Sequence, residues 1–264
     1  MQQQAVIDIA DLGVSFERDG HRIVAFSGVS LKADAGRFVV LIGPSGCGKS
    51  TLLRAIADLL GCTEGKVRVF GDEPAQARKA RRISFVFQDP TLLPWRTVTE
   101  NVRLPIEVGN WRQLGRANRR AEELIGLVGL SGREAALPHE LSGGQRQRVS
   151  IARALITQPD VLLMDEPFGA LDEITRDRLN DELLRIWRET RTTIVFVTHS
   201  LSEAAFLGQS IVVMGTNPGR IVEQIDLDRR KPDNRIERTA ADFFAITSEL
   251  RAVLERDHGS VLRR

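Results

Sequence analysis

A short glycine-rich segment carries the residues whose types and spacing point most directly to chemistry. Residues 43–51 read GPSGCGKST, which fits the pattern G-x-x-x-x-G-K-[ST]. Such a loop turns backbone N–H groups inward, and its lysine and hydroxyls suit the phosphates of a nucleotide and a Mg²⁺ ion. We expect every residue of the loop to bind nucleotide, namely Gly43, Pro44, Ser45, Gly46, Cys47, Gly48, Lys49, Ser50 and Thr51.

Roles within this loop follow from side-chain chemistry. Lys49 is expected to reach the β- and γ-phosphates, Ser50 to hold Mg²⁺, and Thr51 to add a phosphate contact. Cys47 is expected to serve as a small side chain rather than as a reactive thiol. A glycine-rich turn with a chance lysine is the alternative. It is disfavoured because strand-like RFVVLIG precedes the loop and a helical pattern follows it, with an apolar stripe of Leu52, Leu53, Ile56, Leu59 and Leu60.

A second candidate site lies at the end of another apolar run. Residues 161–166 read VLLMDE, so two carboxylates emerge where a buried strand would end. In open parallel sheets, ligands bind at that edge. Asp165 is expected to orient Mg²⁺, and Glu166 to act as general base for an attacking water. Alone, the pattern would also fit a strand followed by a solvated turn, and only the phosphate loop makes the catalytic interpretation strong.

The elements that must position these residues follow from hydrophobic periodicity. Residues 5–34 alternate as two strands around a turn at Asp19-Gly20, and residues 66–90 read as strand, polar turn and strand. From about 91 to 150 the chain is helical and rich in arginine, with helical patterns at 111–130 and 143–156. A β–α–β pattern then returns. We predict an α/β fold with a mainly parallel sheet, an N-terminal antiparallel β subdomain and an inserted α-helical subdomain.

Composition excludes several classes of protein. The 264 residues include 37 Lys and Arg against 35 Asp and Glu, a net charge of +2 that gives no electrostatic reason to expect nucleic-acid binding. No apolar run approaches the ~18 residues of a membrane span, and the N-terminus lacks the pattern of a secretory signal. Cys47 and Cys62 make no disulfide framework, which fits a reducing cytosol.

The run LSGGQ at residues 141–145 resembles the signature of the ATP-binding subunits of ABC transporters. The other motifs of that family follow in the expected order, over roughly residues 5–220: Phe16 for the aromatic that stacks on adenine, Gln88 for the Q-loop, Asp172 for the D-loop and His199 for the H-switch. The resemblance implies a P-loop NTPase core, with ATP and Mg²⁺ as ligands.

The resemblance also implies a head-to-tail dimer of two copies. Each ATP would lie between the phosphate loop of one copy and the signature of the other, with these signature residues in contact: Ser142, Gly143, Gly144 and Gln145. Gln88 would sense the γ-phosphate and Mg²⁺, and His199 would hold the γ-phosphate and support Glu166. Phe16 would stack on adenine, although a core aromatic is the alternative.

One phosphate loop and one signature make this chain half of an ATPase pair. We expect it at the cytoplasmic face of the cell membrane, docked on permease subunits and acting indirectly with an extracytoplasmic solute-binding protein. Leu92, Leu93 and Trp95 would line the docking groove, or be ordinary core residues. The runs LLPW, DEPFGALDEITR and MGTNPGRIVEQIDLD resemble the nitrate, sulfonate and taurine importer branch, which implies uptake of a small anion of that kind.

Several alternatives stay open on sequence grounds. The ATPase could serve another solute, such as bicarbonate, a vitamin or a pyrimidine precursor, or a lipid or lipoprotein export permease. A regulator that binds ATP without turnover would lack Glu166 or His199, and both are present. We expect an ATPase domain over residues 1–220, with its helical subdomain at about 91–150. A short extension over 221–264 would end in a helix with the apolar stripe Phe243, Ile246, Leu250, Val253 and Leu254.

Overall fold

A computed structural model describes residues 5–18, 20–109, 120–169 and 171–261. The chain folds as two compact units. Unit 1 joins Met1–Ala80 to Thr193–Arg264, and unit 2 is Arg81–Thr192. The domain boundary predicted at residue 220 remains a prediction.

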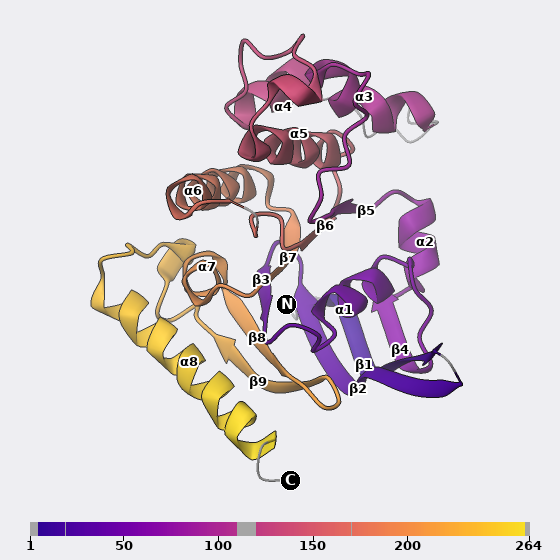
Figure 1. Cartoon of the computed structure of the whole chain (residues 1–264), viewed down its shortest axis with the longest axis vertical. Coiled ribbons are helices and arrows are strands. Elements are labelled where there is room, and N and C mark those ends of the chain that lie inside the picture. The colour runs from indigo at the N-terminus through magenta and orange to yellow at the C-terminus, as the bar shows by residue number, and fades with distance from the viewer. Residues whose placement is uncertain (1–4, 19, 110–119, 170, 262–264) are drawn as a thin grey trace. The chain divides into compact units, whose positions relative to one another are not determined.

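Unit 1 begins with a three-stranded antiparallel sheet in the order β2-β1-β4 (Figure 1). These strands are β1 (Ala5–Arg18), β2 (His21–Asp34) and β4 (Glu64–Val69). Alternating apolar side chains such as Ile7 and Ile9 are buried, as expected for strands with one face on a core. The predicted N-terminal antiparallel subdomain is confirmed.

Unit 1 also contains the strands that lead to the phosphate loop. The central strand β3 pairs in parallel with β7 and β8, and β8 pairs antiparallel with β9. Every residue of β3, β7 and β8 is buried, because helices cover sheets of this kind on both faces. The bounds are β3 (Phe38–Ile42), β7 (Thr193–Thr198), β8 (Ser210–Gly215) and β9 (Arg220–Asp226).

Helices of unit 1 differ in two places from the sequence expectations. The bounds are α1 (Lys49–Ile56), α2 (Pro74–Lys79), α7 (Leu201–Leu207) and α8 (Ala241–Val261), with a 3₁₀ turn η3 (Pro232–Asn234). The first helix ends earlier than predicted, since Asp58 has a left-handed φ of 57°, and Leu59 is 52% exposed. The predicted polar turn before residue 82 contains α2, which starts at Pro74 because proline suits the first helical turn.

The C-terminal helix α8 packs on α7, β8 and β9. Four residues of its predicted stripe are buried, namely Phe243, Ile246, Leu250 and Val253, whereas Leu254 is half-buried. Among the residues that the structure describes, no helix is long and apolar enough to cross a membrane.

Unit 2 holds a short parallel strand pair and a group of helices. The strands β5 (Ile83–Val86) and β6 (Val161–Asp165) pair in parallel. The helices are α3 (Val98–Val108), α4 (Ala121–Leu127), α5 (Gly143–Leu155) and α6 (Glu173–Thr190), with a 3₁₀ turn η2 (Pro138–Glu140). The inserted helical subdomain is thereby confirmed, and residues 111–119 of the predicted helix 111–130 lie outside the described residues.

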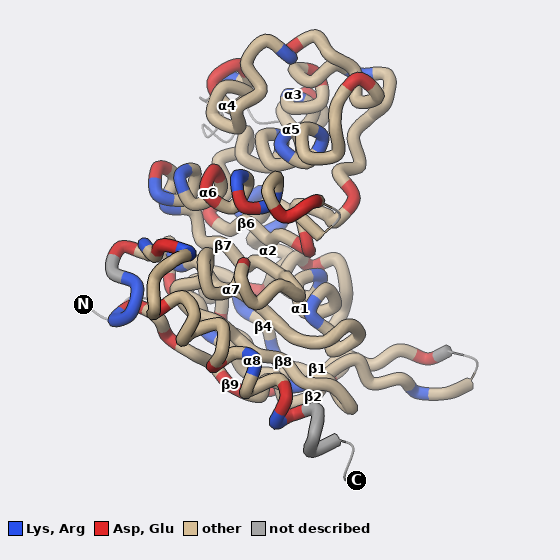
Figure 2. Tube along the Cα trace, turned by 60° about the vertical axis from the view of Figure 1, so that its left-hand side comes forward, with Lys and Arg blue, Asp and Glu red and all other residues tan. Residues whose placement is uncertain are grey.

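Acidic and basic residues are mixed along α6 (Figure 2). Arg185 illustrates this, because its guanidinium pairs with Glu182 at 2.7 Å and with Glu189 at 2.9 Å. Pairs at these spacings lie on one helix face and support the helix modestly.

Candidate active site

The phosphate loop joins β3 to α1 in unit 1. Gly46 and Gly48 have φ angles of 81° and 95°, in the left-handed region that residues with a Cβ rarely adopt. Gly43 is required for a different reason, since a Cβ there would lie 2.9 Å from Cys47 Sγ. The loop therefore owes its curled shape to its glycines.

Lys49 is the first residue of α1 and is 5% exposed. Its Nζ donates hydrogen bonds to Gly43 O at 2.8 Å and to Pro44 O at 2.9 Å. These contacts hold the ammonium within the loop, beside the N-terminus of a helix. Both the ammonium and the helix N-terminus favour a bound anion.

Cys47 is buried in the same loop, and its Sγ lies 3.7 Å from Lys49 Nζ. Burial raises the pKa of the thiol, although the nearby ammonium acts in the opposite direction. The thiol therefore stays protonated at neutral pH, which suits a packing role rather than a nucleophilic one.

His199 leaves the sheet at the same edge as the phosphate loop. In the parallel pairing of β7 with β3, Thr198 lies opposite Ile42. The next residues along the chain are His199 and Gly43, so both functional segments start from neighbouring strand ends. His199 is exposed and directly precedes Ser200, the N-cap of α7, whose side chain accepts a hydrogen bond from Glu203 N.

A cavity of about 440 Å³ lies beside the phosphate loop. Its lining includes Val24 from β2 and the turn between β8 and β9, with Pro44, Ser45 and Gly46 from the loop. Val24 lies opposite Ser15 in the sheet, and the next residue, Phe16, is 41% exposed. The alternative of a buried core aromatic is therefore wrong for Phe16, and its role in stacking on adenine stays a prediction.

In unit 2, Gln88 and the two acidic residues also lie at neighbouring strand ends. Val86 lies opposite Met164 in the β5–β6 pair. Gln88 comes two residues after Val86, and Asp165 and Glu166 come directly after Met164. The parallel pairing thus brings these three residues to one edge, as the sequence predicted for the acids.

The two acids differ in environment. Asp165 ends β6 and is 6% exposed, whereas Glu166 is half-buried and has a left-handed φ of 44°. A backbone of this kind is strained for a residue with a side chain, and such strain concentrates at functional positions. The backbone carbonyl of Glu166 accepts a hydrogen bond from Gly169 N at 3.1 Å, which closes the turn after β6.

The LSGGQ run forms the beginning of α5. Ser142 is the N-cap, with its Oγ 3.3 Å from Gln145 N and its own N–H donating to Gln145 Oε1 at 2.9 Å. This reciprocal capping box sets the start of the helix at the two glycines. A Cβ at Gly144 would lie 3.1 Å from Thr175 Cγ2, so the α5 start and α6 approach closely there.

Asp172 caps α6 by accepting a hydrogen bond from Thr175 N at 3.0 Å. That bond lowers the pKa of the Asp172 carboxyl. The residue therefore has a structural role in its own chain, beside the role in nucleotide binding that the sequence predicts.

Comparison with known proteins decides the family. The family model described as ABC transporter matches residues 26–169, more than half of the chain. The chain belongs to the ABC transporter family. It is 45% identical to the taurine import ATP-binding protein of Rhizobium johnstonii, over 90% of this chain and 91% of that one. It is 40% identical to the aliphatic sulfonates import ATP-binding protein of Bacillus subtilis, over 92% of this chain and 91% of that one.

A bacterial ABC transporter cassette solved as a dimer has the same fold. Its TM-score to this chain is 0.70 at 32% identity, with 84% of this chain and 98% of that one covered. The same cassette has been solved in a post-hydrolysis state with ADP and Pi, with the same TM-score and coverage. This ABC protein is accordingly an ATP-binding ATPase subunit.

Sequence reasoning did not single out two polar residues of α5 in this ABC ATPase. Gln147 is buried and donates to Phe87 O at 3.3 Å, next to Gln88. Arg153 donates to Pro90 O at 2.6 Å and to Thr91 O at 2.9 Å. Both side chains connect α5, which starts at the LSGGQ run, to the segment around Gln88. The only hint in the sequence was that polar residues occur on the inner face of this helix.

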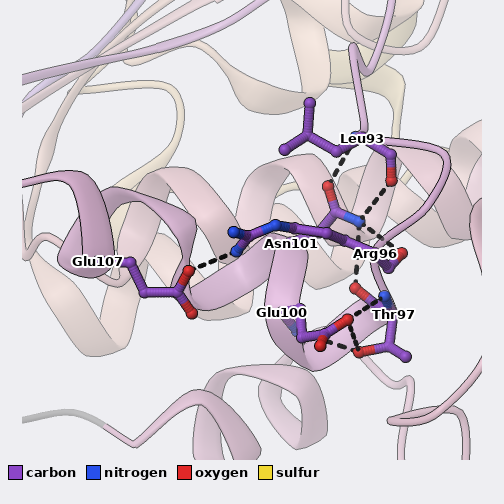
Figure 3. A network of polar contacts seen from close by, with 6 residues as sticks. All are labelled: Leu93, Arg96, Thr97, Glu100, Asn101 and Glu107. Carbon is purple, nitrogen blue, oxygen red and sulfur yellow. Dashed lines mark hydrogen bonds and ion pairs between the residues drawn. The ribbon is translucent and has the colours of Figure 1, made fainter.

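Asn101 of α3 fixes the next part of that segment (Figure 3). Its buried amide accepts from Leu93 N at 2.9 Å and donates to the carbonyl oxygens of Leu93, Arg96 and Thr97 at 2.9–3.1 Å. Leu93 and its neighbour Leu92 are half-buried, whereas Trp95 is 72% exposed. The alternative of ordinary core residues is wrong for Trp95, and docking of a permease there stays a proposal.

Proposed function

We propose that this ABC ATPase is the ATP-hydrolysing subunit of an importer for a sulfonate such as taurine, and that ATP brings two copies together to drive a membrane permease. The observation that carries the proposal is the edge of the β3–β7 pair, where the Lys49 loop and His199 follow neighbouring strand ends. The solute class is supported by the taurine and sulfonate names of relatives at 40–45% identity.

The phosphate loop binds the nucleotide in this proposal. Lys49 and the backbone N–H groups of Gly46 and Gly48 surround the β- and γ-phosphates, and the N-terminus of α1 adds favourable partial charge. Phe16 offers an exposed flat ring for adenine. His199 donates a hydrogen bond to the γ-phosphate.

Hydrolysis needs a base for the attacking water. Glu166 accepts the water proton while the water oxygen bonds to the γ-phosphorus. The bond between the γ-phosphorus and the β–γ bridging oxygen breaks, and that oxygen leaves with ADP. Ser50, Gln88 and Asp165 would hold Mg²⁺, and their hydroxyl, amide and carboxylate oxygens fit the preference of this cation. When bound, Mg²⁺ neutralises charge on the phosphates.

Two copies would complete each nucleotide site. Ser142, Gly143, Gly144 and Gln145 of one copy bind the γ-phosphate held by the other, since a helix start with two glycines presents backbone N–H groups. Asp172, the N-cap of α6, binds nucleotide beside these signature residues in the same proposal. ATP therefore stabilises the dimer, and hydrolysis removes the contact that favours it.

Coupling to transport requires a surface on this subunit for the permease. Trp95 is exposed on a segment that Asn101 holds rigidly, close in sequence to Gln88. We place the permease contact there, on the cytoplasmic face of the membrane. A solute-binding protein outside the cytoplasm would deliver the anion to the permease.

Glu166→Gln tests the hydrolytic assignment in purified protein. ATP turnover is expected to fall by about a hundredfold or more, because the base is lost while the side chain keeps its shape. ATP should then produce a stable dimer in size-exclusion chromatography. Glu173→Gln, on the exposed first turn of α6, serves as the matched control. Turnover at the parent rate in Glu166→Gln would refute the base assignment.

Growth of a strain that lacks this chain tests the solute. Taurine or an alkanesulfonate is supplied as sole sulfur source, and nitrate as sole nitrogen source in parallel. Loss of growth on the sulfonates, restored by the parent gene but not by Glu166→Gln, is the expected result. Loss on nitrate alone would assign the importer to nitrate, and normal growth on all sources would overturn the solute class.

A further inference from the structure

The C-terminal helix α8 lies beside β9 in unit 1 (Figure 1) and contacts it near the turn that leads back to β8. Asp257 of α8 is 8% exposed, and its Oδ1 accepts a hydrogen bond from Arg220 Nη2 at the start of β9. The carboxylate packs against Gly215, where a Cβ would lie 2.8 Å from Asp257 Cγ. A carboxylate this buried requires a charged partner.

Arg220 continues the connection from the helix into the turn. Its Nη1 donates to Thr216 O at 2.8 Å and reaches Pro218 O at 3.5 Å. One planar guanidinium thus binds the α8 carboxylate and the turn carbonyls together. The planar fork of N–H donors in arginine serves these partners from two separate nitrogens, whereas a lysine ammonium carries all its donors on one nitrogen.

The turn also contacts the phosphate loop and its supporting strand. Gly219 packs against the carbonyl oxygens of Cys47 and Ala25, so closely that a Cβ would overlap both. Its backbone forms hydrogen bonds with β2, since Ser27 N donates to Gly219 O at 3.0 Å and Gly219 N donates to Ala25 O at 3.2 Å.

The same turn forms one wall of the cavity beside the phosphate loop. Residues 216–219 line it together with Pro44, Ser45 and Gly46 of the phosphate loop. A shift of the turn would therefore change both the shape of this cavity and the support of the Cys47 carbonyl. No motif of the nucleotide site uses Asp257 or Arg220.

We propose that Asp257 is a positioning residue for nucleotide binding: through Arg220 it holds the turn at 216–219 against the phosphate loop. The inference rests on the proposal that this loop binds ATP. The C-terminal helix then contributes to nucleotide affinity through the turn at 216–219. A change in how α8 is docked would be transmitted to the loop by this route.

The test measures ADP affinity by isothermal titration calorimetry, together with KM and kcat for ATP and the thermal midpoint of the full chain. Asp257→Ala is expected to weaken ADP binding and raise KM about fivefold, which equals about 1 kcal/mol, with kcat changed less than twofold. Asp257→Asn keeps an acceptor oxygen for Arg220 and should give an intermediate value.

A matched control uses a second ion pair between α8 and β9. Arg256 Nη2 lies 3.4 Å from Glu223 Oε2, on an exposed part of the same two elements but away from the turn. Glu223→Gln should leave ADP affinity and KM at parent values. Equal weakening in this control would overturn the proposal, since general loosening of α8 would then explain the effect.

Arg220→Lys keeps the test informative if the Asp257 variants do not fold. It preserves the charge beside Asp257 but loses the planar fork that serves the carboxylate and the turn carbonyls from separate nitrogens, so KM should rise with little change in thermal midpoint. Parent KM and ADP affinity in folded Asp257 or Arg220 variants would overturn the proposal. Lys49→Ala separates the two hypotheses, because parent ADP affinity in that variant would instead refute the phosphate-loop assignment.

Discussion

Thr198 at the end of β7 lies opposite Ile42 at the end of β3, so His199 and Gly43 follow adjacent positions of one parallel strand pair. Two segments more than 150 residues apart in sequence are thereby brought to the same sheet edge. This register places a histidine and a glycine-rich loop at adjacent strand ends, as our proposal that both contact one nucleotide requires.

His199→Ala should remove ATP turnover while leaving ADP binding close to the parent value. The imidazole is expected to contact the γ-phosphate, which ADP lacks, so kcat should fall about a hundredfold or more. Steady-state kinetics and calorimetry with ADP measure the two effects. His21→Ala, at the exposed start of β2, is the control and should leave kcat at the parent value. Weakened ADP binding with unchanged kcat would contradict the assignment.

Gly46→Ala and Gly48→Ala should differ in stability although both positions have positive φ. A Cβ at Gly46 meets nothing within 4 Å, so only backbone strain of about 1–2 kcal/mol is expected. A Cβ at Gly48 would lie 2.9 Å from Phe26 Cδ1, which adds about 1–3 kcal/mol of crowding. Urea denaturation gives the two free energies of unfolding.

Gly71→Ala provides the control for function, because Gly71 has a φ of 83° and open space at its Cβ but lies outside the loop. Its free energy of unfolding should fall as in Gly46→Ala, while ADP affinity stays unchanged. If Gly46→Ala also left ADP affinity unchanged, close approach of phosphate to this glycine would be excluded.

Asn101→Ala should destabilise the fold by about 3 kcal/mol, since it leaves the N–H of Leu93 and several carbonyl oxygens without their buried partner. Arg96→Ala removes the partly exposed ion pair with Glu107 and a charge near the exposed Glu100, and should cost less than about 1 kcal/mol. Urea denaturation distinguishes them. Equal losses would show that the Asn101 network contributes no more than a surface pair.

Maleimide should label Cys62 and leave Cys47 unmodified in the native protein. Cys47 is buried and Cys62 is exposed, and burial raises the pKa of both thiols. Because a raised pKa leaves less thiolate at a given pH, labelling of Cys62 should speed up as pH rises past the ordinary thiol range near 8.5. Mass spectrometry counts the labels, and Cys62→Ser should take none until it is unfolded.

Much of the fold was predictable because its signals are local. The alternation in β1 and β2, the unbroken apolar runs of β3 and β6, and the stripe of α8 each reflect a periodicity of a few residues. The end of α1 was not predictable in this way. Leu59 continues the apolar spacing, but the chain turns at Asp58, whose left-handed φ ends the helix.

The motifs of this ABC ATPase are visible in its sequence, because nucleotide-binding loops need particular side chains at fixed spacing. Which distant residues meet depends on the tertiary structure. The pairing of Ile42 with Thr198, the contact of Gly219 with Cys47 and the burial of Asp257 against Arg220 depend on strand register and packing over long sequence separations. Such contacts are selected by the burial of the whole core, and no short stretch of sequence contains them.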